Sequence, residues 1–275
     1  MPRLHESDRK RYRYGVKSRP RRWPKRLVVV ILTALAIGLI GLVAARALGL
    51  HWSDHPQPAS IEKAVQRFRE ARPQASELEG VYLYSTVGSE SVDALGGSRH
   101  RYPKTTSMTV LRTSCGITIQ WSALAARSTN WTICRTVWGI ELRAYDEIHR
   151  FFWKTDHTSY TCDPGVLMTP NARADTLYRF ECRSKSGYQA GTVTLYGEET
   201  IEVDGETLAA IHVDLSGRLH GGEQGSETID FWLDKQSMIP LRIVKKSRTS
   251  RALVVGRVHY KEDVDLQLTS TTPLR

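Results

Sequence analysis

The chain carries none of the short motifs that mark common catalytic sites. No G-x-S-x-G elbow, H-E-x-x-H zinc motif, P-loop or glycine-rich dinucleotide fingerprint occurs in its 275 residues. The histidines and carboxylates are scattered along the chain rather than grouped at a catalytic spacing. We therefore expect that this protein is not an enzyme and that it holds no cofactor and no metal.

Cysteine is scarce, and no two cysteines form a C-x-x-C pair, which disfavours a structural zinc site. The four cysteines are Cys115, Cys134, Cys162 and Cys182. An even number in an exported domain predicts two disulfides, for which three connectivities are possible. We favour Cys115–Cys134 with Cys162–Cys182, because these pairs close loops of similar length. Loop closure gives about 3 kcal/mol of stabilisation for each bridge.

Excess positive charge is nearly absent from most of the chain, although the net charge is +10. Residues 1–26 contain 11 Lys and Arg against two acidic residues, which is +9 and leaves +1 for residues 27–275. A nucleic-acid-binding domain carries its excess charge on the folded part, so nucleic acid is excluded as a partner. We expect a basic, disordered cytoplasmic tail over 1–26 that contacts anionic lipid headgroups.

Charged residues are also missing from 27–45, which is LVVVILTALAIGLIGLVAA. A helix of this length matches a bilayer, so we predict a transmembrane helix over 27–46. The basic flank places the N-terminus in the cytoplasm and the remainder outside, in a single-pass protein of the cell membrane. A cleaved signal peptide and a twin-arginine export signal at Arg21-Arg22 are the alternatives to this uncleaved signal-anchor.

Residues 47–76 are expected to form a stalk and a short amphipathic helix. Ile61, Ala64, Val65 and Phe68 have helical spacing, Ser60 is a plausible N-cap, and Pro73 ends the pattern. This helix is predicted to pack on the following domain or to lie along the membrane surface.

From residue 77 to 275 the hydrophobic period is two, as in Cys115-Gly-Ile-Thr-Ile-Gln-Trp121. Alternation of this kind is typical of antiparallel strands with one buried face. About ten such segments lie between Val81 and Leu268, and no stretch is typical of a crossover helix. We predict a mainly β domain, a curved antiparallel meander that forms a half-barrel or an open barrel.

Asp204-Gly205 predicts a hairpin turn. A two-residue loop pairs Ile201 with Leu208 and puts Ile211 on the opposite face. A three-residue loop pairs Ile201 with Ala209 and keeps the apolar positions together, so we favour it or a bulge near Ala209. The following hairpin and the closing strand pair make the last 80 residues a meander of about six strands.

The stretch from Asp146 to Ala174 is the least regular, and we predict a long excursion, partly helical or looped, pinned by a disulfide. Long loops on rigid sheets often carry function. The candidate ligand-binding residues are Phe151, Phe152, Trp153, His149 and His157.

Two segments, GEETIEVDGETLAAIHVDLS (197–216) and DFWLDKQSMIPLRIV (230–244), carry a resemblance to known proteins. This meander, over about residues 190–270, resembles that of the bacterial lipoprotein-carrier superfamily, in which a curved half-barrel cradles helices or lipid. With GVYLYS (80–85) and RHRYPKTT (99–106), the arrangement is also similar to uncharacterised single-pass membrane proteins of actinobacteria. Neither resemblance implies a catalytic residue.

Two functions remain. One is a membrane-anchored extracytoplasmic binding module that holds a lipid-like ligand or an envelope component on its concave face. The alternative is an interaction or sensing protein of the cell envelope that docks a protein partner and has no ligand cavity. A continuous apolar cavity favours the first, and a filled core with an exposed apolar patch favours the second.

Overall fold

The computed structural model describes residues 25–47, 56–152, 154–253 and 256–275. The chain divides into two units, residues 1–51 and 52–275. The first contains helix α1 (Lys25–Ala47), which forms over the predicted apolar run. In the described part of the chain, no helix is both long and apolar enough to cross a membrane, so the predicted transmembrane span over 27–46 is not supported.

The second unit begins with the predicted amphipathic helix, α2 (Ile61–Ala71). The side chain of Ser60 accepts a hydrogen bond from the backbone N–H of Lys63 at 3.2 Å, which caps the first turn. Phe68 is buried, and α2 packs against β1 and β3, as one of the two predicted placements required. Residues 48–55 of the predicted stalk lie outside the described residues.

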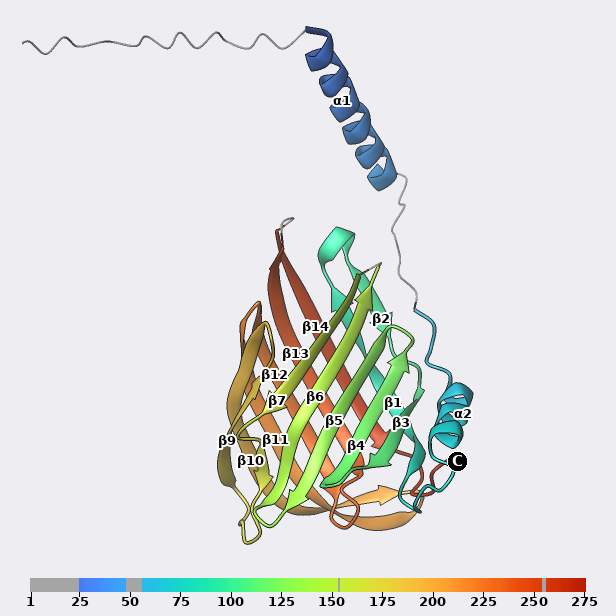
Figure 1. Ribbon diagram of the computed structural model, residues 1–275, viewed down its shortest axis with the longest axis vertical. Helices are drawn as coiled ribbons and strands as arrows, with labels where there is room; N and C mark the ends of the chain where they lie inside the picture. The colour runs from blue at the N-terminus through green and yellow to red at the C-terminus, as the bar shows by residue number, and fades with distance from the viewer. Residues whose placement is uncertain (1–24, 48–55, 153, 254–255) are drawn as a thin grey trace, which may run out of the picture. The chain divides into compact units, whose positions relative to one another are not determined.

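The remainder of this unit is one antiparallel sheet (Figure 1). Its strands are β1 (Gly80–Val92), β2 (Ser98–Arg101), β3 (Thr105–Arg112), β4 (Gly116–Leu124), β5 (Arg127–Thr136), β6 (Gly139–Phe151), β7 (Lys154–Cys162), β8 (Val166–Met168), β9 (Thr176–Arg183), β10 (Gly187–Val203), β11 (Glu206–Gly221), β12 (Glu223–Asp234), β13 (Pro240–Leu253) and β14 (Gly256–Leu268). A short 3₁₀ turn, η1 (Ala94–Gly96), joins β1 to β2. Fourteen strands thus replace the ten expected.

The sheet closes on itself, which corrects the predicted half-barrel or open barrel. The strand order runs from β14 down to β3 and β1, and β1 pairs in turn with β14, for example Tyr84 with Leu268. Side chains that alternate along each strand therefore point either into an enclosed interior or outward. The weakest link is between β7 and β9, which share only two residue pairs, Thr161–Arg183 and Cys162–Cys182.

The stretch from Asp146 to Ala174 is more regular than predicted. It continues β6 to Phe151 and then forms β7 and β8, so that irregular backbone is confined mainly to the connection between β8 and β9. Its polar and aromatic residues alternate along two paired strands, and for that reason they lack the apolar period of the neighbouring segments. The expected helix or long loop in this stretch is wrong.

The 204–205 hairpin has the strict two-residue loop, with Ile201 opposite Leu208. The predicted longer loop is therefore wrong, and the register shift lies instead between Leu195 and Gly197 on β10. A bulge there lets Val193 and Leu195 pair with Leu215 and Val213 while Ile201 still pairs with Leu208. Ile201 and Leu208 therefore lie on the face opposite Ile211, where they are only half-buried. The C-terminal meander has five strands, β10 to β14, rather than six.

Both predicted disulfides are confirmed, Cys115–Cys134 and Cys162–Cys182. The first joins the start of β4 to β5, two strands that are paired along most of their length. The second joins β7 to β9 at the link held by two residue pairs. The two bridges close loops of similar length but support very different amounts of strand pairing.

This difference predicts unequal effects of removing the bridges. Cys162→Ala with Cys182→Ala should lower the free energy of unfolding by about 3 kcal/mol and speed amide hydrogen exchange throughout β7 and β9. Cys115→Ala with Cys134→Ala should cost a similar free energy but leave exchange in β4 and β5 nearly unchanged. Urea unfolding and hydrogen-exchange mass spectrometry measure both. Equal exchange rates around the two removed bridges would contradict the inference that the pairing of β7 with β9 is the weakest in the ring.

Candidate functional site

The interior of the closed sheet is layered along the strands. Its larger part is an apolar core, which includes Trp131, Ile119, Phe231 and Leu266. Continuing along the same inward-facing positions, β13 passes from Ile243 to Lys245 and β14 passes from Val264 to Glu262. A layer of buried charge therefore lies directly above the core, on the side where β6 ends and β7 begins, which we call the mouth end.

Six charged residues and two histidines form this layer, which we call the charge cluster. Its members are Glu90 of β1, His100 of β2, Arg127 of β5, Glu147 and His149 of β6, Glu227 of β12, Lys245 of β13 and Glu262 of β14. Seven different strands supply them, so only closure of the sheet brings them together.

Arg127 is fully buried and joins two of the carboxylates. Its Nε donates to Glu262 Oε1 at 3.0 Å, and its Nη2 donates to Glu262 Oε2 at 3.0 Å and to Glu147 Oε1 at 3.2 Å. Tyr102 adds a hydroxyl that donates to Glu262 Oε1 at 2.5 Å. A bidentate guanidinium–carboxylate pair with all its donors engaged is the geometry that lets such charges be buried.

Lys245 is the second buried cation, and three carboxylates share it. Its Nζ contacts Glu147, lies 3.0 Å from Glu227 Oε2 and lies 3.3 Å from Glu262 Oε2. Burial alone would raise the pKa of Glu262, but Arg127 and Lys245 together hold that pKa well below its usual range. Burial raises the pKa of Glu227, and Lys245 offsets only part of this effect.

The histidines lie at the edge of the cluster beside Glu90. His100 Nδ1 is 2.9 Å from Glu90 Oε1, and His149 Nδ1 is 3.1 Å from Glu90 Oε2. Burial and the nearby charge of Arg127 each lower the pKa of His149. The hydrogen bonds of His149 with Glu147 and Glu90 have the larger effect, so the pKa of His149 is raised overall. The hydroxyl of Tyr260 donates a hydrogen bond to Glu90 Oε2 at 3.0 Å, so both oxygens of the Glu90 carboxylate have partners.

A cavity of about 330 Å³ opens above the charge cluster at the mouth end. Glu147, Glu227 and His149 line its floor. Its walls are aromatic and aliphatic, and include Phe151, Phe152, Tyr160, Tyr260, Leu219, Leu253 and Val258. The volume is at the lower end of the range for sites that bind small molecules. Such sites are usually lined by apolar side chains with a few polar groups, as this cavity is.

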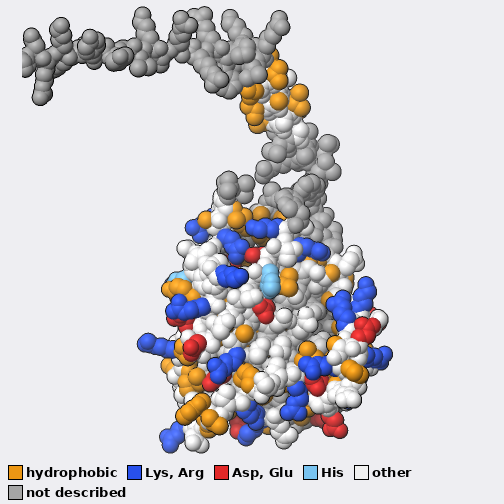
Figure 2. Space-filling view, in the orientation of Figure 1, with side chains coloured by type: hydrophobic (Ala, Val, Ile, Leu, Met, Phe, Trp, Pro, Cys, Tyr) orange, Lys and Arg blue, Asp and Glu red, His pale blue; other side chains and the backbone are white. Residues whose placement is uncertain are grey.

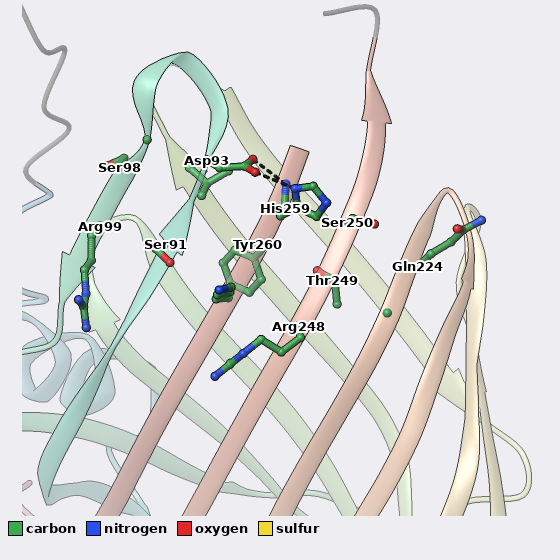
Figure 3. A pocket seen from close by; sticks show the side chains of 14 residues that line it. Ser91, Asp93, Ser98, Arg99, Gln224, Arg248, Thr249, Ser250, His259 and Tyr260 are labelled. Atoms are coloured by element: carbon green, nitrogen blue, oxygen red, sulfur yellow. Dashed lines mark hydrogen bonds and ion pairs between the residues drawn. The ribbon is translucent and has the colours of Figure 1, made fainter. Parts of the chain in front are cut away.

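A larger hollow of about 790 Å³ lies across β1, β2, β12, β13 and β14 (Figure 3). Most of its polar side chains already have partners: His259 Nδ1 is 2.7 Å from Asp93 Oδ2, Arg248 Nη2 is 2.7 Å from Asp263 Oδ2, and Arg99 donates to Ser89. It is therefore less suited than the interior cavity to hold a ligand. On the face shown in Figure 2, acidic and basic side chains are interspersed rather than gathered by sign.

A second group of titratable side chains lies on the outer face of β10 to β12. His212 is 2.7 Å from Glu199 Oε1 and 3.3 Å from Asp230 Oδ1, and its ring stacks on Trp232 at 4.1 Å between centroids. Both ring nitrogens are thus occupied. Across the described ranges, no group of three or more His, Cys, Asp or Glu side chains is arranged to hold a metal ion.

Three of the five candidate residues come together at the cavity. His149, Phe151 and Phe152 line it. His157 does not, because it alternates with Asp156 and Thr158 on β7 and faces outward, where it is exposed and 3.4 Å from Ser159 Oγ. Trp153 lies outside the described residues. Their role in binding stays a prediction.

The charge cluster was not predicted from the sequence, although part of its signal is present there. Extending the alternation of Leu268, Leu266 and Val264 by one step reaches Glu262, and extending that of Leu241 and Ile243 reaches Lys245. A charge that continues an inward-facing series is the signal of a buried ion pair. Arg127 continues the inward series of Ile133, Trp131 and Thr129 on β5, but the polar Thr129 makes that series harder to recognise from the sequence.

We expect Arg127 and Glu262 to be strongly coupled. Arg127→Met or Glu262→Gln should each lower the free energy of unfolding by about 3–5 kcal/mol, because each variant leaves the remaining buried charge without its principal partner. The double variant should cost clearly less than the sum of the two. Urea unfolding with intact disulfides gives the double-mutant cycle.

The exposed pair Arg248–Asp263 is the matched control. Its Nη2 lies 2.8 and 2.7 Å from the two carboxylate oxygens, so both oxygens are again in contact with the guanidinium, but both side chains are about half exposed. The cycle of Arg248→Met and Asp263→Asn should give a coupling below about 1 kcal/mol. Equal coupling in the two cycles would show that burial does not set the strength of the interior pair.

Asp214, on the outer face of β11, predicts that the folded state becomes less stable as the pH rises. Burial and the neighbouring Asp230 raise its pKa to about 6. The unfolded chain, with a pKa of about 3.9, loses this proton first, so the folded state loses stability as pH rises from about 4 to 6. Asp214→Asn should therefore unfold at higher urea concentration than the parent at pH 7 and at the same concentration below pH 4. A difference that does not change with pH would rule this out.

No family model matches the chain, and no curated protein matches it. Among solved structures, it is similar to the crystal structure of the hypothetical lipoprotein YmcC from Escherichia coli (K12), at 10% sequence identity and a TM-score of 0.30. The match covers 75% of this chain and 98% of that chain. A TM-score at this level carries no argument, and the expected resemblance to the lipoprotein-carrier superfamily stays a prediction.

Proposed function

We propose that residues 56–275 form a binding module for a small hydrophobic or lipid-like ligand, which enters the interior of the sheet at the mouth end. The observation that carries the proposal is the cavity of about 330 Å³ with walls of Phe151, Tyr160 and Leu219. Burying apolar ligand surface there is favourable by roughly 25 cal/mol per Å².

We further propose that this module acts outside the cytoplasm, in the cell envelope. The two disulfides support an oxidising compartment, since cytosolic thiols are kept reduced. Attachment to the cell membrane, with the N-terminus in the cytoplasm and anionic lipid contacts from the basic tail, stays a prediction of the charge pattern in residues 1–45.

The alternative, an interaction protein that docks a protein partner, has one observation in its favour. Val137 and Trp138, between β5 and β6 at the end opposite the mouth, are 83% and 75% exposed. Exposed tryptophan is common at the centre of protein interfaces. Two neighbouring residues make a small patch, however, and the enclosed cavity is the more extensive feature.

The proposal is tested by titrating the full chain with the neutral fluorescent probe N-phenyl-1-naphthylamine. We expect saturable one-to-one binding that Leu219→Trp weakens at least tenfold, because the larger ring fills the cavity. Leu177→Trp is the matched control, since Leu177 is 65% exposed and does not line the cavity. Circular dichroism checks that both variants fold. Absence of saturable binding to the parent chain would refute the proposed function.

A further inference from the structure

We propose that the ligand is an amphiphile with a cationic ammonium group, which binds beside Glu227 and Thr249 while its apolar part lies toward the mouth. This inference rests on the proposed function and adds the chemistry of the head group. Four observations carry it: the shortage of positive charge around the cavity, a buried hydroxyl without a partner, the aromatic walls, and the prior pairing of the cations that an anion would need.

The shortage of positive charge follows from the contacts of the cluster. Glu147, Glu227 and Glu262 all share the single ammonium of Lys245. Arg127 is committed to Glu262 and Glu147, and it lies 3.8 Å from Glu90. Glu227 is the least compensated of the four glutamates, since Lys245 is its only ionic contact among the described residues. It is also one of those that line the cavity.

A second carboxylate increases this imbalance nearer the mouth. Glu223 lines the cavity from the same strand as Glu227, and among the described residues its one ionic contact is with Arg251 at 3.5 Å. Arg251 is already held by Asp156 at 2.7 Å. A cation between these two glutamates would therefore gain attraction from both, in a site where nearby water is limited and the attraction is poorly screened.

The buried hydroxyl is independent of these charges. Thr249 lines the cavity and is 5% exposed, and its Oγ1 has no hydrogen-bond partner within the described part of the chain. It lies opposite Gly225 in the pairing of β12 with β13, midway between Glu223 and Glu227 in register. Gly225 lets β12 approach β13 closely at this point, because an added Cβ would lie 2.6 Å from the Cα of Thr249. A buried polar atom without a partner costs about 1–3 kcal/mol, which an ammonium N–H donating to Thr249 would recover.

The walls suit both parts of such a ligand. Tyr160 and Tyr260 present aromatic rings, whose faces attract an ammonium ion. Leu219, Leu253 and Val258 supply aliphatic surface for an alkyl chain. Thr249 and Tyr260, which are labelled in Figure 3, border the outer hollow as well as the cavity.

An anionic head group fits the same cavity poorly. Of the two Lys and Arg side chains that line it, Arg251 is paired with Asp156, and Lys154 is exposed. A carboxylate or phosphate placed deeper would face Glu147, Glu223 and Glu227, and the two cations described there, Arg127 and Lys245, are already paired with glutamates. The head group that the lining selects is therefore positive.

The experiment compares three ligands with the same tail, decylammonium, decyl sulfate and decanol, each displacing N-phenyl-1-naphthylamine from the full chain. Decylammonium should displace the probe at a concentration at least tenfold below that of decanol and of decyl sulfate. Glu227→Gln, Glu223→Gln and Thr249→Val should each reduce the preference for decylammonium over decanol at least threefold, with decanol displacement unchanged. Glu206→Gln, an exposed carboxylate in the turn region between β10 and β11, should keep the full preference.

The outcomes separate this inference from the proposed function. If the probe binds and all three decyl ligands displace it equally, or if decyl sulfate is preferred, the cavity binds apolar ligands but the cationic head group is refuted. If the probe does not bind at all, the proposed function itself fails. If Glu227→Gln does not fold, Glu223→Gln and Thr249→Val decide, because neither lies within the Arg127–Lys245 contacts. A preference that survives both of these variants would also overturn the inference.

Discussion

Four glutamates lie with one arginine and one lysine inside the sheet, and each of these buried charges needs a partner of opposite sign. An uncompensated buried charge costs several kcal/mol, which is a large share of the stability of an ordinary domain. The partners come from β1, β5, β6, β12, β13 and β14, so the charges are compensated only when the sheet is closed. Closure and charge pairing therefore depend on each other, and strands far apart in the chain must meet in one register.

The layering of the interior follows from this constraint. Below the charge cluster, inward-facing aliphatic and aromatic residues form a dry core, where burial supplies most of the stabilisation. Above it, the strands continue to the mouth end but the side chains no longer fill the interior, and the cavity remains. The bridge between Cys162 and Cys182 reinforces the ring where its strand pairing is shortest.

A cavity whose floor is a network of ion pairs differs from a purely apolar pocket. The floor is rigid, because Arg127 and Lys245 hold their carboxylates in fixed geometry, and preorganised groups recognise a ligand at low entropic cost. In the binding that we propose, the local excess of carboxylates would also disfavour anions. In the binding module that we propose, ligand binding and folding would depend on the same residues, whereas Glu223 and Thr249 line the cavity outside the contacts of Arg127 and Lys245.

The sequence by itself determined the β class, the amphipathic helix from Ile61, both disulfides and the near-neutral charge of the main domain, because these depend on local periodicity, composition and cysteine spacing. It also pointed to His149, Phe151 and Phe152. Only the tertiary structure decided the closure of β1 on β14, the two-residue loop at 204–205 and the charge cluster. The physical reason is that register and closure arise from pairing between distant strands, and a glutamate at an inward position looks like any surface glutamate until the strand carrying its partner is placed opposite.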